Sequence, residues 1–328
     1  MLPETMRTIE VSEFGTADML VGGERPLPVP GDNQVLVRTI ACGVNGPDLL
    51  QRRGHYPPPP DATDLMGLEV SGEVVQTGKD VKRWTVGDRV CALTHGGAYA
   101  EFVAVNEDHC LPIPKGVEEV DAAGLPETYF TVWSNFFLEK QINQGKLFLV
   151  HGGAGGIGST AIQLGTALGL NVFTTVSNDE NTKFCESLGA TRAINYRNDD
   201  FVEIVRSAGG ADIILDIVGG EYIGRNIKAA SPDATIVQLA FNQGSRVEVD
   251  LMPVMLKRLT FTGSTLRSRP PEFKARIASD LEDRAWPLFA SGKLKTLTHT
   301  VFSFDEVIAA HKLMEAKQHR GKILLTPN

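Results

Sequence analysis

The sequence predicts an α/β protein built from two domains, a β-rich N-terminal domain and a doubly wound parallel sheet. Its 328 residues exceed what one hydrophobic core usually serves. Residues 1 to about 125 contain β-branched runs broken by glycines, with no long amphipathic helix among them. From about residue 125, uninterrupted apolar runs alternate with helix-like segments, which is typical of a parallel sheet covered on both faces.

The first domain is expected to be a curled antiparallel sheet or a small barrel. Its predicted strands are 34–44, 70–81, 84–93 and 97–105. Four prolines within 57–60 predict a stiff exposed loop.

The second domain is expected to hold six strands, at 146–152, 171–177, 191–196, 211–218, 234–240 and 259–265. Predicted helices are 159–169, 179–189, 201–207 and 253–258. The tail returns to a helical pattern at 271–292 and ends in a strand at 321–327, which we expect to fold back onto the first domain. The predicted domains are therefore 1–128, completed by 271–328, and 129–270.

Composition limits the possible partners and compartment. A net charge of −8 argues against nucleic acid or an anionic membrane as the main partner. No apolar stretch approaches the roughly 18 residues that a bilayer span needs, and the first 15 residues lack the apolar segment of a secretory signal. Four scattered cysteines without a CxxC pair suit reduced thiols, so a cytoplasmic protein is expected.

A glycine turn between the first strand and first helix of the second domain fits the pattern GxGxxG. It reads Gly153, Ala154, Gly155, Gly156, Ile157 and Gly158. In this pattern glycines allow a tight turn, a close approach of the backbone to a pyrophosphate and close packing of helix on strand. Free N–H groups at the helix N-terminus then favour the phosphates. The turn predicts a dinucleotide site.

The tip of the next strand suggests which dinucleotide is bound. NAD sites usually place a carboxylate there to hold the ribose 2′-hydroxyl. Here the tip carries Ser177 and Asn178, and Asp179 falls one step later, where it suits a helix N-terminus. Ser177 and Asn178 are expected to bind a 2′-phosphate, with Lys183 and Tyr196 reaching it from neighbouring turns. NADPH is therefore favoured over NADH, although Lys183 equally suits a solvated helix face.

Further motifs give the chain a family resemblance. They are residues 41–60 (ACGVNGPDLLQRRGHYPPPP), 67–74 (GLEVSGEV), 86–90 (VGDRV), 266–269 (LRSR) and 321–325 (GKILL). Together with the glycine turn they resemble the medium-chain dehydrogenase/reductase superfamily, and within it the quinone oxidoreductase branch of the zeta-crystallin type. The resemblance implies a GroES-like catalytic domain, a Rossmann cofactor domain and a substrate site in the cleft between them.

Zinc enzymes of that superfamily differ from this chain at the metal ligands. They carry a cysteine where this chain has Asn45 and a histidine where it has Leu68, and neither replacement supplies a zinc ligand. The four-cysteine structural zinc lobe is missing, and Pro47 stands in place of a proton-relaying hydroxyl. No metal site is therefore expected. The expected reaction is hydride transfer from NADPH to a quinone or an α,β-unsaturated carbonyl, because such acceptors delocalise the arriving charge without a metal ion.

Three residues are the candidates for catalysis. Tyr56 is expected to donate a hydrogen bond to the acceptor or to stack on it, the alternative being that it packs the proline loop. Asn45 is expected to make polar contact near the nicotinamide, or else to be a turn former. By resemblance, the family position of Thr131 implies a place near the nicotinamide. The alternative is that its hydroxyl bonds the backbone of its own helix. Asp48 and Arg52 have the spacing of an intrahelical pair, which favours a structural role.

Other residues are expected to complete the cofactor site. Phe241, Asn242 and Leu266 follow predicted strands, and doubly wound sheets bind ligands at the carboxyl ends of their strands. Lys317 and Lys322 are candidates to approach a phosphate, although such lysines are more often solvated.

Two other functions remain open. One is an enoyl-thioester reductase of the same superfamily. The other is a non-catalytic NADPH-binding protein, crystallin-like or RNA-binding. The resemblance also implies a homodimer in which the apolar stretch 258–266 pairs with its twofold mate. His151 ends the first strand of the second domain and is expected to be structural.

Overall fold

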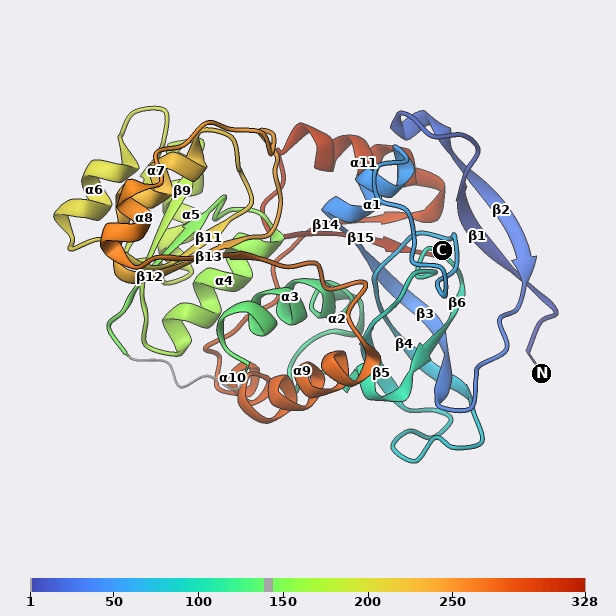
Figure 1. Cartoon of the computed structure of the whole chain (residues 1–328). Helices are drawn as coiled ribbons and strands as arrows, with labels where there is room; N and C mark the ends of the chain where they lie inside the picture. Colours follow the sequence, from blue (N-terminus) through green and yellow to red (C-terminus); the bar gives the residue numbers. More distant parts are fainter. Residues whose placement is uncertain (1, 139–143, 328) are drawn as a thin grey trace. The chain divides into compact units, whose positions relative to one another are not determined.

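A computed structural model describes residues 2–138 and 144–327 of the chain (Figure 1). The chain divides into two compact units, residues 1–133 with 267–328 and residues 134–266. In the described residues, no helix is long and apolar enough to cross a membrane.

The first unit is built on an extensively antiparallel sheet. Its order is β14 (Thr298–Ser303), β15 (Lys322–Thr326), β3 (Gln34–Val44), β4 (Glu69–Thr77), β5 (Arg89–Leu93) and β7 (Cys110–Pro112), with β6 (Phe102–Asn106) also on β3. A hairpin of β1 (Thr5–Val11) and β2 (Leu20–Pro26) forms a separate two-stranded sheet. Because β15 pairs antiparallel with β3, the C-terminal strand does return to the first unit.

Three predicted strands of the first unit are shorter than expected. The strand predicted at 70–81 ends at Thr77, and two others begin late, after glycines whose backbone lies outside the β region. Gly87 has φ +101°, so β5 begins only at Arg89 and not at residue 84. Gly96 and Gly97 have φ +142° and +85°, and β6 begins at Phe102 and not at residue 97.

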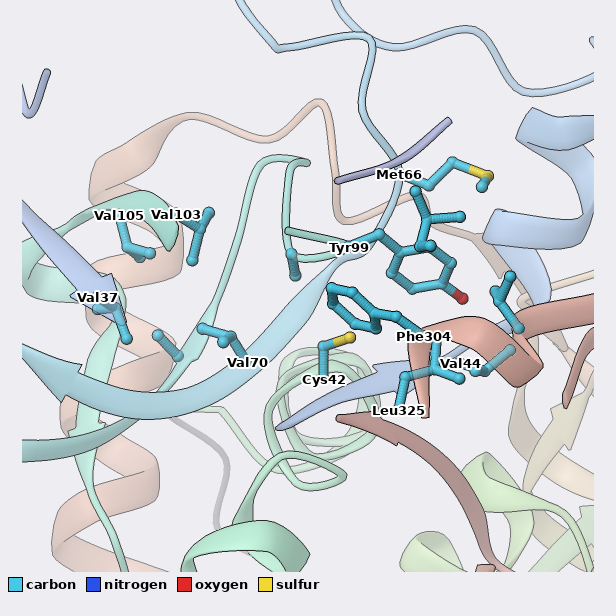
Figure 2. Packing of buried hydrophobic residues seen from close by; sticks show 14 of the residues in the cluster. Val37, Cys42, Val44, Met66, Val70, Tyr99, Val103, Val105, Phe304 and Leu325 are labelled. Carbon is cyan, nitrogen blue, oxygen red and sulfur yellow. The ribbon is translucent and has the colours of Figure 1, made fainter. Parts of the chain in front are cut away.

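The core of the first unit gathers side chains from strands that are far apart in sequence. Figure 2 shows one buried cluster that contains Cys42 of β3, Leu325 of β15, and Tyr99 and Phe304 from outside the strands. The α-helices of this unit are α1 (Gly46–Arg52), α2 (Glu119–Ala122), α3 (Pro126–Phe136), α9 (Pro271–Arg284), α10 (Trp286–Ala290) and α11 (Val307–Ala316). Helix α3 extends past residue 133, where the first unit ends.

The second unit holds one parallel sheet of six strands. They are β8 (Leu147–His151), β9 (Asn171–Val176), β10 (Arg192–Asn195), β11 (Ala211–Asp216), β12 (Ala230–Gln238) and β13 (Thr260–Gly263). The order β10-β9-β8-β11-β12-β13 makes the chain reverse its direction of winding between β8 and β11. Doubly wound sheets bind dinucleotides at that point.

The helices of the second unit are α4 (Gly156–Ala167), α5 (Asp179–Ser187), α6 (Phe201–Ser207), α7 (Tyr222–Ala229) and α8 (Met252–Lys257). Helix α7 was not predicted from the sequence. The predicted fold class, a β-rich domain with a doubly wound parallel sheet, is confirmed. All four cysteines are buried and free.

Candidate functional site

The glycine turn lies where β8 passes into α4, beside the reversal of the sheet. Gly152 has φ +75°, and the N–H groups of Gly152 and Gly153 both donate to Thr175 O at 3.1 Å. A Cβ on Gly158 would stand 2.2 Å from Gly152 O, whereas a Cβ on Gly155 would meet nothing closer than 3.9 Å. Gly158 therefore permits the close packing of helix on turn, and Gly155 leaves an open backbone face.

That open face is suited to an anion. Gly155 is the N-cap of α4 and offers no side chain to cap it. The first N–H groups of a helix have no intrahelical partner, and the helix dipole favours negative charge there. A cradle that a side chain would fill, next to uncapped N–H groups, fits the pyrophosphate of a dinucleotide.

Neutral side chains occupy the tip of β9. Asn178 caps α5, because its Oδ1 accepts from Asn181 N at 2.8 Å, and its Nδ2 donates to Ser177 Oγ at 3.4 Å. Asp179 Oδ1 accepts from Asn195 Nδ2 at 2.8 Å. The nearest carboxylate is thus engaged by the end of β10, and the tip itself carries a hydroxyl and an amide.

Tyr196 and Lys183 flank this tip. Asn195 pairs with Val176 in the parallel register, and Tyr196 N donates to Val176 O at 3.1 Å. The register therefore places Tyr196 beside Ser177, and its side chain is 43% exposed. Lys183 is exposed on α5. The structure brings Ser177, Asn178 and Tyr196 to one edge of the sheet.

The loops after β11 and β12 lie against each other at the same edge. Asn242 N donates to Ile217 O at 3.3 Å, and a Cβ on Gly219 would stand 2.8 Å from the Phe241 ring. Phe241 is 46% exposed, and Leu266, which follows β13, is half-buried. Phe241 and Asn242 therefore lie at the carboxyl edge of the sheet, as expected for that pair.

His151 takes part in a buried polar network below the turn. Its Nδ1 lies 3.0 Å from Thr175 Oγ1 and its Nε2 lies 2.7 Å from Asn226 Oδ1, while Asn226 Nδ2 donates to Asp216 Oδ2 at 2.9 Å. Burial lowers the pKa of His151. These bonds tie β8, β9, β11 and α7 together, in agreement with the structural role predicted for His151.

In the first unit, Asn45 belongs to a buried network with Glu69 and Lys322. Asn45 Nδ2 donates to Glu69 Oε1 at 2.8 Å, and Asn45 Oδ1 accepts from Lys322 Nζ at 2.6 Å. Lys322 Nζ also pairs with Glu69 Oε1 at 2.6 Å, and the Glu69 side chain is fully buried. Both polar atoms of the Asn45 amide are thus engaged inside the protein.

This network corrects the interpretation of Lys322. Its ammonium is buried with Glu69 and Asn45, so it is not a solvated group that approaches a phosphate. Lys317 is exposed at the C-terminal end of α11, where it takes a left-handed conformation with φ +55°.

Asp48 and Arg52 also differ from the prediction. Asp48 Oδ2 accepts from Asn45 N at 2.8 Å and its Oδ1 accepts from Gly67 N at 3.1 Å. Arg52 pairs with Glu315 of α11 and donates to Gly15 O at 3.2 Å. The predicted intrahelical pair is wrong, because each side chain binds a different element. These contacts agree with the structural role that was favoured for both residues. Burial raises the pKa of Asp48 to about 6.

Tyr56 is half-buried near Arg267. The Arg267 Cζ lies 5.8 Å from the centroid of the Tyr56 ring. Arg267 Nε donates to His95 O at 3.1 Å and Nη1 to Gln51 Oε1 at 2.7 Å, whereas the buried Nη2 has no hydrogen-bond partner among the described residues. Burial is the main cause of a raised pKa for Tyr56.

Two carboxylates of this region, Glu69 and Glu127, were not predicted as site residues. Glu127 N donates to Glu69 Oε2 at 2.8 Å, which attaches the start of α3 to the Asn45 network. Thr131 lies four residues later on the same helix, so the two side chains share a face. Burial, followed by the negative charge of Glu69, raises the pKa of Glu127 to about 8. The spacing of Glu127 from Thr131 was the one signal in the sequence for this residue.

The donor set does not suit a metal ion. Leu68 is buried and offers no ligand, and Asn45 is engaged as described. Across residues 2–138 and 144–327, no group of three or more His, Cys, Asp or Glu side chains is placed to hold a metal. A cavity of about 600 Å³ in this unit lies among residues 59–63, residues 95–97, β6 and Lys274, and its described lining includes none of the three candidate catalytic residues.

Two family models match the chain, an alcohol dehydrogenase GroES-like domain over residues 31–115 and a zinc-binding dehydrogenase over residues 156–282. The chain is 28% identical to the quinone oxidoreductase of Mus musculus, over 98% of this chain and 97% of that protein. The chain belongs to the medium-chain dehydrogenase/reductase superfamily. Another relative is the human synaptic vesicle membrane protein VAT-1 homolog, which is 29% identical over 98% of this chain and 86% of that protein. The quinone oxidoreductase relatives support an oxidoreductase.

Solved structures of the superfamily agree with the fold. The quinone oxidoreductase of Escherichia coli, solved as a complex with NADPH, has a TM-score of 0.86 and 26% identity, over 98% of this chain and 100% of that one. The CurK enoyl reductase has a TM-score of 0.85 and 27% identity, over 99% of both chains.

Proposed function

We propose that this member of the superfamily is an NADPH-dependent, zinc-independent reductase of quinones or α,β-unsaturated carbonyls. The observation that carries the proposal is the cradle at the start of α4, where the open face of Gly155 adjoins uncapped N–H groups. The relatives add support, since one similar structure is a quinone oxidoreductase in complex with NADPH.

The cofactor residues proposed are those at the carboxyl edge of the parallel sheet. The turn from Gly153 to Gly158 would hold the pyrophosphate, and the neutral tip of β9 would hold the 2′-phosphate without charge repulsion. Phe241, Asn242 and Leu266 are proposed to line the rest of the cofactor. NADPH supplies a hydride when bound.

The first unit is proposed to bind and protonate the acceptor. Tyr56 and Thr131 stay predicted contacts of substrate or nicotinamide. Asn45 also stays a prediction, and its engagement by Glu69 and Lys322 favours a supporting contact over a free polar group. Quinones and enones delocalise the charge that arrives with hydride, so this chemistry does not need a Lewis acid.

The test is NADPH oxidation by the purified chain against a panel of quinones and enones. The expected result is a rate well above the rate without acceptor and unchanged by EDTA. If every acceptor leaves NADPH oxidation at the background rate, the proposal fails. If activity is lost on chelation and returns with zinc, the zinc-independent part fails.

A second candidate is an enoyl-thioester reductase, because the CurK enoyl reductase matches 99% of this chain. A crotonyl thioester distinguishes the two. Higher kcat/KM for the thioester than for any quinone or simple enone would favour the second candidate.

We also propose a homodimer through β13. This strand lies at the edge of the six-stranded sheet, and its four residues are all exposed. Nearby on α8, Met252, Met255 and Leu256 are each more than 60% exposed. An exposed strand edge with apolar neighbours favours pairing with a second copy. A cytoplasmic location remains part of the proposal, supported by four buried free thiols.

A further inference from the structure

The cavity of about 600 Å³ in the first unit borders the whole of β6, and all its lining residues belong to that unit. The side chains of Val103 and Val105 pack in the core cluster of the unit. Successive side chains of a strand point to opposite faces, so Phe102, Ala104 and Asn106 share the other face. Ala104 is the smallest of these three, and a larger side chain there would take up room in the cavity.

The walls of this cavity are mostly apolar and are set before anything binds. Leu65, Leu93 and Phe102 line it and are buried. Prolines supply further wall at residues 59–60 and, at the start of α9, at residues 270–271. A proline ring fixes φ, so these segments lose little freedom when a ligand packs against them. Apolar walls and a volume in this range are typical of a small-molecule site.

Three charged side chains occur in the described lining, and their sum is positive. Lys274 and Arg269 are cationic, and Asp61 is anionic. Two histidines also line the cavity. Burial lowers the pKa of His109 to about 4, so this ring is neutral at pH 7. His95 accepts from Lys274 through Nδ1 and is neutral in that arrangement. The lining therefore carries one net positive charge.

Lys274 is a buried ammonium that no carboxylate contacts. The residue is 3% exposed, and its Nζ donates to Arg267 O at 2.7 Å and to His95 Nδ1 at 3.4 Å. Lysine has three N–H donors, so one remains. In the part of the chain that the structure describes, no carboxylate lies within ion-pair distance of Nζ. Burial lowers the pKa of Lys274, and the more distant charges of Glu127 and Asp61 raise it.

The contacts around Lys274 fix its position at the cavity wall. Arg267 Nε donates to His95 O at 3.1 Å, so Lys274, Arg267 and His95 hold one another in a closed set of bonds. His95 Nε2 lies 3.2 Å from Asp61 Oδ1 and donates to it, which keeps Nδ1 as the acceptor for Lys274. A cationic donor that its neighbours already orient is suited to bind an anion.

We propose that this cavity binds a small monocarboxylate with an apolar body, whose carboxylate is held by Lys274. The single net positive charge of the lining matches one carboxylate, and the apolar walls match the body. The described lining includes none of the proposed cofactor or catalytic residues. The inference therefore stands or falls independently of the proposed function.

The first test compares three ligands by isothermal titration calorimetry of the full chain. Octanoate has both features, 1-octanol has the body without the charge, and acetate has the charge without the body. Octanoate should bind saturably, at one site per chain. The two controls should bind at least roughly 10–100-fold more weakly, the range of a hydrogen bond to a charged group. Octanoate that does not saturate, or that binds no more tightly than either control, overturns the proposal.

The second test removes the charge of the anchor. Lys274→Met keeps most of the side-chain length, so the Kd for octanoate should rise by roughly 10–100-fold while that for 1-octanol stays unchanged. Lys293→Met is the matched control, because Lys293 is exposed and is not part of the described lining. It should bind both ligands as the wild-type protein does. Equal octanoate affinity in Lys274→Met and Lys293→Met would overturn the role of Lys274 and the proposal with it.

The third test fills the cavity and leaves every polar contact in place. Ala104→Phe puts a residue that suits strands on the cavity face of β6. It should weaken octanoate and 1-octanol alike by at least roughly tenfold, whereas Lys274→Met weakens octanoate alone. This variant also decides the matter if Lys274→Met fails to fold. Octanoate affinity unchanged in folded Ala104→Phe would place the ligand outside this cavity, and the proposal would be wrong.

Discussion

Removing the ammonium of Lys322 is expected to destabilise the first unit strongly. Lys322→Met keeps most of the aliphatic length but deletes the partner of Glu69, whose side chain is fully buried. Lys322 Nζ lies 2.6 Å from Glu69 Oε1 and 2.6 Å from Asn45 Oδ1. The substitution therefore leaves a buried carboxylate without its counter-charge and an amide oxygen without its donor.

Breaking one side of a buried ion pair costs about 3–5 kcal/mol of the free energy of unfolding. With a urea m-value of about 2–3 kcal/mol/M, that loss lowers the urea midpoint by roughly 1–2.5 M. The companion variant Lys322→Met with Glu69→Gln should recover part of the loss, since it removes the unpaired charge as well.

Tryptophan fluorescence during urea unfolding measures this unit selectively. Trp84, Trp133 and Trp286 all belong to the first unit. Lys115→Met is the control, because Lys115 is exposed and such changes usually stay within about 0.5 kcal/mol. A midpoint for Lys322→Met equal to that of Lys115→Met would refute the reasoning, and so would a double variant less stable than Lys322→Met.

Four further outcomes are expected. Gly158→Ala should lose about 1–3 kcal/mol of stability by calorimetry, because its Cβ would meet Gly152 O at 2.2 Å. Gly155→Ala should unfold as the wild type does, yet fluorescence titration should show NADPH binding roughly tenfold weaker, about 1.4 kcal/mol. Ser177→Asp should reverse the preference to NADH, since like charges repel the 2′-phosphate, and unchanged dissociation constants would contradict this. Phe261→Lys on the edge strand should give a monomer by sedimentation, and a monomeric wild type would remove the basis for it. The folded protein binds more protons at Glu127 than the unfolded chain between about pH 4.5 and about pH 8, so stability should fall as pH rises through that window. Urea midpoints across pH should show this fall, and Glu127→Gln should lessen it.

The parallel sheet could be predicted from the sequence because its signals are local. Uninterrupted apolar runs, glycine turns and helical periodicity each lie within one short segment, and every strand predicted in the second unit is present. Helix α7 was not predicted because it follows two glycines, Gly219 and Gly220, and spans only residues 222–229. The strand starts that were wrong lay at glycines whose left-handed conformations a pattern of β-branched residues does not reveal.

The polar cluster of the first unit could not be predicted in the same way. Asn45 directly follows β3, and Glu69 and Lys322 begin β4 and β15, so their contact depends on how the sheet is ordered. The four-residue spacing predicted that Arg52 pairs with Asp48 on its own helix. The buried Arg52 guanidinium instead pairs with Glu315 on α11. The pKa of Glu127 depends on burial and on charges distant in sequence, which no spacing encodes.

The same cluster explains which acceptors the chain would suit. Asn45 occupies the position where the zinc enzymes that this chain resembles carry a metal ligand. Lys322 binds Asn45, but its positive charge is balanced by the carboxylate of Glu69. No net positive charge from that pair is then available to polarise a simple carbonyl. The Glu127 carboxyl, whose pKa burial raises to about 8, and the Arg267 Nη2, which has no hydrogen-bond partner among the described residues, can donate hydrogen bonds, but neither replaces the charge of a metal ion. Acceptors that spread the incoming charge over a conjugated system need no more than this, so under the proposed function we expect quinones and enones to suit the cluster better than unactivated ketones.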